Sequence, residues 1–215
     1  KATAKYTKKS KKKVVTSKIT TTVQTTTTQQ VSIANETAVS TTSSGTSVAQ
    51  ATAAASSSQN QSKYEANVAS VAGKMDNRVI AAYQQLGFKI VVDPSVNYSG
   101  YFDARSRSIT MKQIDDSVYH ELGHFLAFIA GNADKTASFQ SIFAAEKANV
   151  TAFNKAYVTQ NASEYFAESV KDYILNNASL KSTRPQTYAA VQNALNQITD
   201  AQIAKIQKIY GAFWN

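Results

Sequence analysis

The part of the sequence best suited to chemistry is the pentapeptide His120-Glu121-Leu122-Gly123-His124. Residues four apart on a helix lie on one face, so His120 and His124 can reach a single metal ion. Imidazole nitrogens are typical zinc ligands, and a catalytic zinc site keeps one position open for water. Glu121 lies beside the histidines, where its carboxylate can accept a proton from water as the water attacks a carbonyl. The spacing therefore predicts a zinc-binding helix that carries a general base, as in zinc-dependent peptidases.

The rest of the composition limits what else could bind the metal. The chain has no cysteine, and these are its only two histidines. A disulfide framework and a thiolate metal site are therefore excluded. The alternative reading, two unrelated histidines on a buried helix, is disfavoured by their spacing and by the adjacent glutamate. A third protein ligand must then be an aspartate or a glutamate.

Two glutamates in the segment Asn161–Ser169 are the best sources of that third ligand. Glu164 and Glu168 would share a helix face, where like charges repel mildly unless a cation lies nearby. A solvated acidic face is the alternative, but the apolar side chains of Tyr165 and Phe166 flank the pair. Spacing alone leaves open which glutamate binds zinc.

The elements that position these residues can be predicted from the apolar pattern. Helical spacing of apolar residues predicts one amphipathic helix over residues 68–86, ended by Gly87. A short strand over residues 88–92 follows, and residues 101–102 and 108–111 flank a polar stretch that is typical of a hairpin.

The metal helix and the elements after it are also predicted. Asp115, Asp116 and Ser117 offer N-caps for a helix that runs through Phe128, and Gly131-Asn132 should end it. Further helices are expected over residues 137–148, 163–176, 186–198 and 200–212. Helices outnumber strands, and the strands precede the metal helix. The fold class is therefore predicted as α+β, a helix-rich zincin-type domain with a small sheet before the metal helix.

Net positive charge is concentrated in the first 62 residues, because they hold few acidic residues. They hold eight of the 23 basic and one of the 14 acidic residues, and from residue 14 they are mostly Thr, Ser, Gln and Ala. Such a composition buries too little apolar surface to fold. We therefore expect a disordered basic, Ser/Thr-rich tail over residues 1–62 and a metallopeptidase domain over residues 63–215.

The tail also bears on partners and location. A solvated spacer is the simpler interpretation, but the lysines at 8–13 could attract an anionic cell-wall polymer. Only Tyr6 lies among the lysines, so we expect no nucleic-acid partner. No apolar run reaches the roughly 18–20 residues that cross a bilayer, so no membrane span is expected. The tail favours a secreted or cell-wall-associated protein.

Three sequence elements together indicate a family. They are the His-Glu-x-x-His motif at 120–124, Tyr157 seven residues before Glu164 in the Ser163–Ser169 segment, and the segment Leu-Lys-Ser-Thr-Arg-Pro-Gln-Thr-Tyr at 180–188. In this combination the chain resembles the anthrax lethal factor-like zinc metallopeptidases, and among them the small secreted Pro-Pro endopeptidases. The resemblance covers most of residues 64–200.

The resemblance implies a role for each residue. Glu164 would be the third zinc ligand, and Glu168 would steady a ligand histidine. Tyr157 would donate its hydroxyl to the oxyanion that forms during hydrolysis. Zincins also pair an extended substrate with the edge strand before the metal helix, for which Ser108–Met111 is the expected platform. The chain departs from the Pro-Pro enzymes at Ser163, where they carry an acid that contributes to substrate selection.

The function expected from the sequence is that of a secreted zinc metalloendopeptidase with one zinc ion per chain. Its substrates would be surface or extracellular proteins, with Pro-rich sequences among the candidates. A different class remains open, a non-catalytic zinc-containing protein that binds the cell wall or another surface. Such a protein would bind metal but would not hydrolyse peptides.

Overall fold

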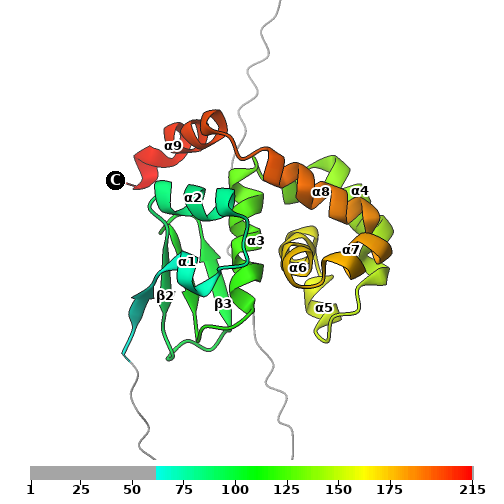
Figure 1. Cartoon of the computed structure of the whole chain (residues 1–215), viewed down its shortest axis with the longest axis horizontal. Coiled ribbons are helices and arrows are strands. Elements are labelled where there is room, and N and C mark those ends of the chain that lie inside the picture. Colours follow the sequence, from blue (N-terminus) through cyan, green and yellow to red (C-terminus); the bar gives the residue numbers. More distant parts are fainter. Residues whose placement is uncertain (1–61, 215) are drawn as a thin grey trace, which may run out of the picture. The chain divides into compact units, whose positions relative to one another are not determined.

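The metal helix lies at the centre of the domain, between a small sheet and a group of helices (Figure 1). The structure is a computed structural model, and it describes residues 62–214. The predicted tail therefore lies outside the described residues, apart from Ser62. The α+β fold class is confirmed, since many helices accompany one four-stranded sheet.

The first segment of the domain is more broken than the sequence predicts. Strand β1 (Tyr64–Ala66) comes first, and α1 (Val68–Val71) and α2 (Asn77–Gln85) replace the single expected helix. The side chain of Asn67 accepts hydrogen bonds from the backbone at the start of α1, and Asp76 does the same for α2. The prediction of one helix is wrong because these two caps begin separate helices. Its apolar positions are still mostly buried.

The sheet places a different strand at its edge from the one expected. Strands β2 (Lys89–Val92), β3 (Gly100–Asp103) and β4 (Ser108–Met111) join β1 in the order β1-β2-β4-β3. The predicted hairpin is confirmed, since β3 and β4 pair antiparallel. However, β4 also pairs with β2 in parallel, so the expectation that Ser108–Met111 forms the edge is wrong. The edge beside the metal helix is β3.

The metal helix α3 (Ser117–Ile129) agrees closely with its prediction. The carboxylate of Asp115 accepts a hydrogen bond from the backbone of Ser117 at 2.9 Å, which fixes the helix start. Gly131 and Asn132 both have positive φ, at 78° and 61°, and end the helix in left-handed backbone. Most side chains of α3 are buried, as expected of a helix covered on opposite sides.

The helices after α3 contain the predicted ones and some further short elements. The predicted helices correspond to α4 (Ala137–Glu146), α6 (Ala162–Leu175), α8 (Pro185–Asn196) and α9 (Asp200–Trp214). The end of the helix predicted over residues 137–148 is the separate short element η2 (Lys147–Asn149). Three further short elements were not predicted, namely η1 (Ala133–Lys135), α5 (Lys155–Val158) and α7 (Asn177–Thr183). Within residues 62–214, no helix is long and apolar enough to cross a membrane.

Helices α3 and α6 pack unusually closely at Gly123. A Cβ atom at this position would lie 2.7 Å from both the Cα and the carbonyl oxygen of Ala167. Real Cβ atoms do not approach backbone atoms this closely, so a side chain here would push the helices apart. The absence of a side chain at Gly123 lets the helix with the two histidines lie directly against the helix with the two glutamates.

We expect Gly123→Ala to destabilise the protein by about 1–3 kcal/mol, although alanine is the better helix former. The substitution should also weaken zinc binding, because it widens the gap between His120 or His124 and Glu164. Thermal unfolding and zinc titration would measure the two effects. Gly211→Ala in α9 is the matched control, since a Cβ atom there meets nothing within 4 Å. Equal melting temperatures for the two variants would contradict this account.

Candidate active site

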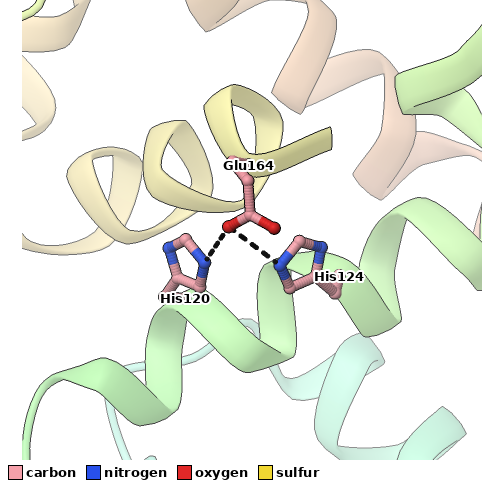
Figure 2. Close-up of side chains that lie close together, drawn as sticks. All are labelled: His120, His124 and Glu164. Atoms are coloured by element: carbon pink, nitrogen blue, oxygen red, sulfur yellow. Dashed lines mark hydrogen bonds and ion pairs between the residues drawn. The ribbon is translucent and has the colours of Figure 1, made fainter. Parts of the chain in front are cut away.

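Three predicted ligand side chains converge between α3 and α6 (Figure 2). Glu164 Oε2 lies 3.1 Å from His120 Nε2 and 3.6 Å from His124 Nε2. One donor atom from each of the three residues lies within 4.8 Å of the others. The histidines come from one face of α3, as their spacing requires, and the glutamate comes from the first turn of α6.

The donor set fits a zinc ion. Two imidazole nitrogens and one carboxylate oxygen form a three-ligand set that is typical of catalytic zinc. His120 is 7% exposed, and the other two side chains are partly buried, so the cluster is not sealed off from solvent. Among the residues described, this is the cluster of histidine and acidic side chains able to hold a metal ion. The roles of the three residues as ligands stay predictions.

The second glutamate of α6 has a different position. Glu168 Oε2 lies 2.9 Å from His120 Nδ1, on the side of the ring away from Glu164. Its other oxygen accepts a hydrogen bond of 3.4 Å from Lys171. A carboxylate at Nδ1 fixes the orientation of the imidazole and leaves Nε2 to face a metal ion. The structure therefore separates the two glutamates, which spacing alone could not do.

The electrostatics of the cluster favour charge on the carboxylates. Burial alone would lower the pKa of His120, but its hydrogen bonds with Glu164 and Glu168 outweigh burial and raise that pKa to about 9. Burial alone would raise the pKa of Glu164, yet its contacts with His120 and His124 lower it strongly. Imidazole binds metal in its neutral form, so a metal ion binding here would displace a proton from His120.

The predicted general base lies beside the ligands in a confined position. Glu121 is 6% exposed, and burial raises the pKa of its carboxyl, although the backbone of Phe102 on β3 acts in the opposite direction. A Cβ atom at residue 100 would lie 2.6 Å from Glu121 Oε1. Gly100 therefore provides the space that Glu121 occupies against β3. The role of Gly100 is not predictable from the sequence, because a lone glycine at a strand start carries no signal for this contact.

Tyr157 approaches the cluster from the short helix α5. Its ring centroid lies 6.3 Å from that of His120, and the residue is 49% exposed. Partial burial and the negative charge of Glu164 raise the pKa of the Tyr157 hydroxyl. The hydroxyl therefore keeps its proton in the neutral pH range and is available as a hydrogen-bond donor near His120.

We expect Tyr157→Phe to lower kcat by about 10²–10³, as does removal of one oxyanion donor in other hydrolases. KM should change little, because ground-state binding barely uses this hydroxyl. Steady-state kinetics would measure both constants, and zinc content and melting temperature should stay at wild-type values. Tyr64→Phe is a suitable control, since Tyr64 is also half exposed but lies on β1. An unchanged kcat in Tyr157→Phe would remove Tyr157 from the mechanism.

Ser163, which directly precedes Glu164, has its hydroxyl turned toward the protein. Its hydroxyl donates to Asp134 Oδ2 at 2.6 Å, and Asp134 of η1 is buried. This contact ties the start of α6, and thus Glu164, to the segment that follows the metal helix. The contribution of Asp134 is not predictable from the sequence, because residues 29 positions apart show no local pattern that links them.

The segment 180–188 contributes a buried polar network behind α6. Glu146 accepts hydrogen bonds from the backbone and the hydroxyl of Thr187, at 2.9 and 2.7 Å, and so caps the start of α8. The hydroxyl of Tyr165 lies 2.7 Å from that of Thr187. Arg184 is paired with Asp172 of α6. These residues hold α6 through a different face from the one that meets the histidines, so the segment has a structural role that the sequence did not indicate.

Two comparisons relate this chain to known proteins. Residues 104–194 match the family model described as anthrax toxin lethal factor, N- and C-terminal domain. The predicted resemblance to the lethal factor family is confirmed. The matched range contains the three residues of the cluster together with Glu121, Tyr157, Glu168 and the network behind α6.

A curated relative gives a second likeness. A Pro-Pro endopeptidase of Clostridioides difficile (strain 630) is 41% identical over 78 residues. The match covers 34% of this chain and 34% of that protein, so it spans about a third of each. The likeness thus concerns a shared part of the two chains.

Proposed function

We propose that this chain is a zinc-dependent endopeptidase with a zincin-type site. The observation that carries the proposal is the convergence of His120, His124 and Glu164 on one point, with the buried carboxylate of Glu121 beside them. A purely structural zinc site uses four protein ligands, whereas three ligands and an adjacent base are the arrangement for hydrolysis. The likeness to a lethal factor domain and to a Pro-Pro endopeptidase supports the same reading.

The residues of the chain would divide the chemistry among them. His120, His124 and Glu164 would hold one zinc ion, which supplies a Lewis acid that polarises the peptide carbonyl and lowers the pKa of water. Glu121 would accept a proton from the attacking water and pass it to the leaving amine, a task that suits a carboxyl whose pKa burial raises. Tyr157 would donate a hydrogen bond to the developing oxyanion.

The edge strand β3 is the proposed platform for the substrate. An extended peptide can add to a sheet edge through main-chain hydrogen bonds. Strand β3 pairs with β4 on one side and begins at Gly100, in contact with Glu121. A peptide along this edge would therefore carry its scissile bond past the base. Tyr98 and Tyr101 are exposed here, with ring centroids 5.9 Å apart, and suit apolar or proline side chains.

We also propose that the protein acts outside the cell or at the cell wall, on surface or extracellular proteins. The support is the concentration of lysine in residues 1–62, which would favour an anionic cell-wall polymer. Pro-rich sequences are the first substrates to test, since one relative is a Pro-Pro endopeptidase. Ser163 bears on the choice of substrate, because it stands where an acid would contribute to substrate selection in the Pro-Pro enzymes. Its hydroxyl donates to Asp134 and is therefore directed away from a substrate.

The decisive experiment is a cleavage profile of the zinc-loaded chain on a peptide library that includes Pro-Pro sequences. We expect one zinc per chain by metal analysis, with cleavage at internal bonds that a chelator abolishes and added zinc restores. Stoichiometric zinc without any cleavage would overturn the endopeptidase and favour the non-catalytic zinc-binding alternative. Cleavage that is insensitive to chelation would overturn the zinc mechanism.

A further inference from the structure

The last turn of α9 is fastened to the turn between β3 and β4. The indole Nε1 of Trp214 donates a hydrogen bond of 2.9 Å to the carbonyl oxygen of Ala104. The guanidinium of Arg107 donates to the carbonyl oxygen of Trp214 at 3.2 Å and lies 5.5 Å from the centroid of its ring. These contacts join positions more than 100 residues apart. We call the three residues Ala104, Arg107 and Trp214 the clasp.

The turn itself is shaped to make these contacts. Arg107 has a φ of 54°, a left-handed conformation that is uncommon for a residue with a long side chain. In this conformation the guanidinium also donates to the carbonyl oxygen of Leu86, at 3.4 Å. Arg107 therefore links the turn to both α9 and the end of α2. Such a strained position persists only where surrounding contacts fix it.

The clasp is connected to the active site through β3. The ring of Phe102 stacks on Phe88 at 5.9 Å, and Phe88 in turn packs edge-on against Trp214 at 5.8 Å. Phe102 lies between the two ends of β3. The first end contacts Glu121 through Gly100, and the second end is held by the clasp. Because β3 is an edge strand, β4 is its one neighbour in the sheet, and its other restraints come from its packing against α3 and from these contacts.

We propose that helix α9 holds the edge strand in place for an incoming peptide, with Trp214 as a positioning residue for the substrate strand. This rests on the proposed function, since it assumes that peptide pairs with β3. An edge strand that bends or frays presents its hydrogen-bonding groups out of register. Anchoring its far end at Ala104 keeps the groups aligned before a peptide arrives, which reduces the ordering cost of binding.

Hydrogen exchange on the zinc-loaded full chain tests the clasp without any substrate. Trp214→Phe keeps an aromatic ring and removes the donor, and Arg107→Lys keeps the charge and cannot make both backbone contacts. In both variants the amides of residues 100–104 should exchange about two- to tenfold faster, which corresponds to the loss of one hydrogen bond. The amides of α6 should be unchanged. Phe213→Ala is the matched control, because Phe213 is next to Trp214 in α9 and its own side chain is 72% exposed.

Fluorescence gives an independent reading of the same contact. Trp214 is the only tryptophan of the chain, so its emission reports the clasp directly. Arg107→Lys should shift this emission to longer wavelength as the indole gains contact with water. Phe213→Ala should leave the emission maximum where it is.

Kinetics on a peptide that the wild-type chain cleaves then test the positioning role. Both clasp variants should raise KM by about two- to tenfold, with kcat within about twofold and zinc content unchanged. Unchanged exchange at residues 100–104 would overturn the clasp. Exchange that rises equally in α3 and α6 would also overturn it, by showing a global loss of stability. If the wild-type chain cleaves no peptide, the proposed function fails, and the exchange result still decides whether α9 holds β3.

Discussion

Replacement of Glu121 by glutamine is expected to lower the kcat of peptide hydrolysis by about 10²–10⁴, while one zinc ion per chain stays bound. The amide has nearly the shape of the carboxyl, so it fits the same space against Gly100. It cannot accept a proton from water in the neutral pH range, and this removes the general base. Because Glu121 lies outside the cluster of His120, His124 and Glu164, zinc content should not change.

Two measurements on one preparation test this expectation. Metal analysis should give wild-type zinc, and kcat on a cleaved peptide should fall by the stated factor. Glu65→Gln is the control, since Glu65 is an exposed glutamate on β1 that pairs with Lys89. Hydrolysis that survives in Glu121→Gln would assign the base to another group. Loss of zinc in this variant would show that Glu121 is a metal ligand rather than the general base.

The elements around the active site differ in how far the sequence predicts them. The metal helix was predicted closely because its signals are local: the polar residues Asp115 and Ser117 at its start, a periodic apolar face, and Gly131 at its end. The hairpin of β3 and β4 was predicted for the same reason. The sequence does not predict which strand forms the edge, because this depends on where β2 enters the sheet. That placement is a long-range choice that no residue within β4 encodes.

The roles of the two glutamates also show what sequence can and cannot decide. Periodicity places Glu164 and Glu168 on one face of α6, and both do lie near His120. Which nitrogen of His120 each one meets depends on how α6 is shifted along α3. That shift is set by the close contact of Gly123 with Ala167. The sequence shows a glycine in a helix but not the partner that requires it.

The positions of these carboxylates lead to a second large expected effect. Glu164→Gln should lose zinc during dialysis and with it nearly all hydrolysis, because it removes one of three ligands from the site. Glu168→Gln should keep zinc with an affinity about 10–100-fold weaker, as is usual when the partner of a ligand histidine is changed. The two variants carry the same substitution four residues apart on one helix, so each is the control for the other.

The difference follows from which nitrogen of His120 each glutamate meets. Glu164 Oε2 lies on the Nε2 side of His120, close also to His124, so we expect its carboxylate to coordinate zinc. Glu168 meets Nδ1 of His120 and also pairs with Lys171, so we expect its carboxylate to orient the ring. A glutamine at position 168 can still accept a hydrogen bond from His120 Nδ1, but its neutral amide attracts the Nδ1 proton less strongly than a carboxylate does. Competition with a chelator of known zinc affinity would rank the variants. Zinc retained by Glu164→Gln and lost from Glu168→Gln would reverse the assignment and make Glu168 the third ligand.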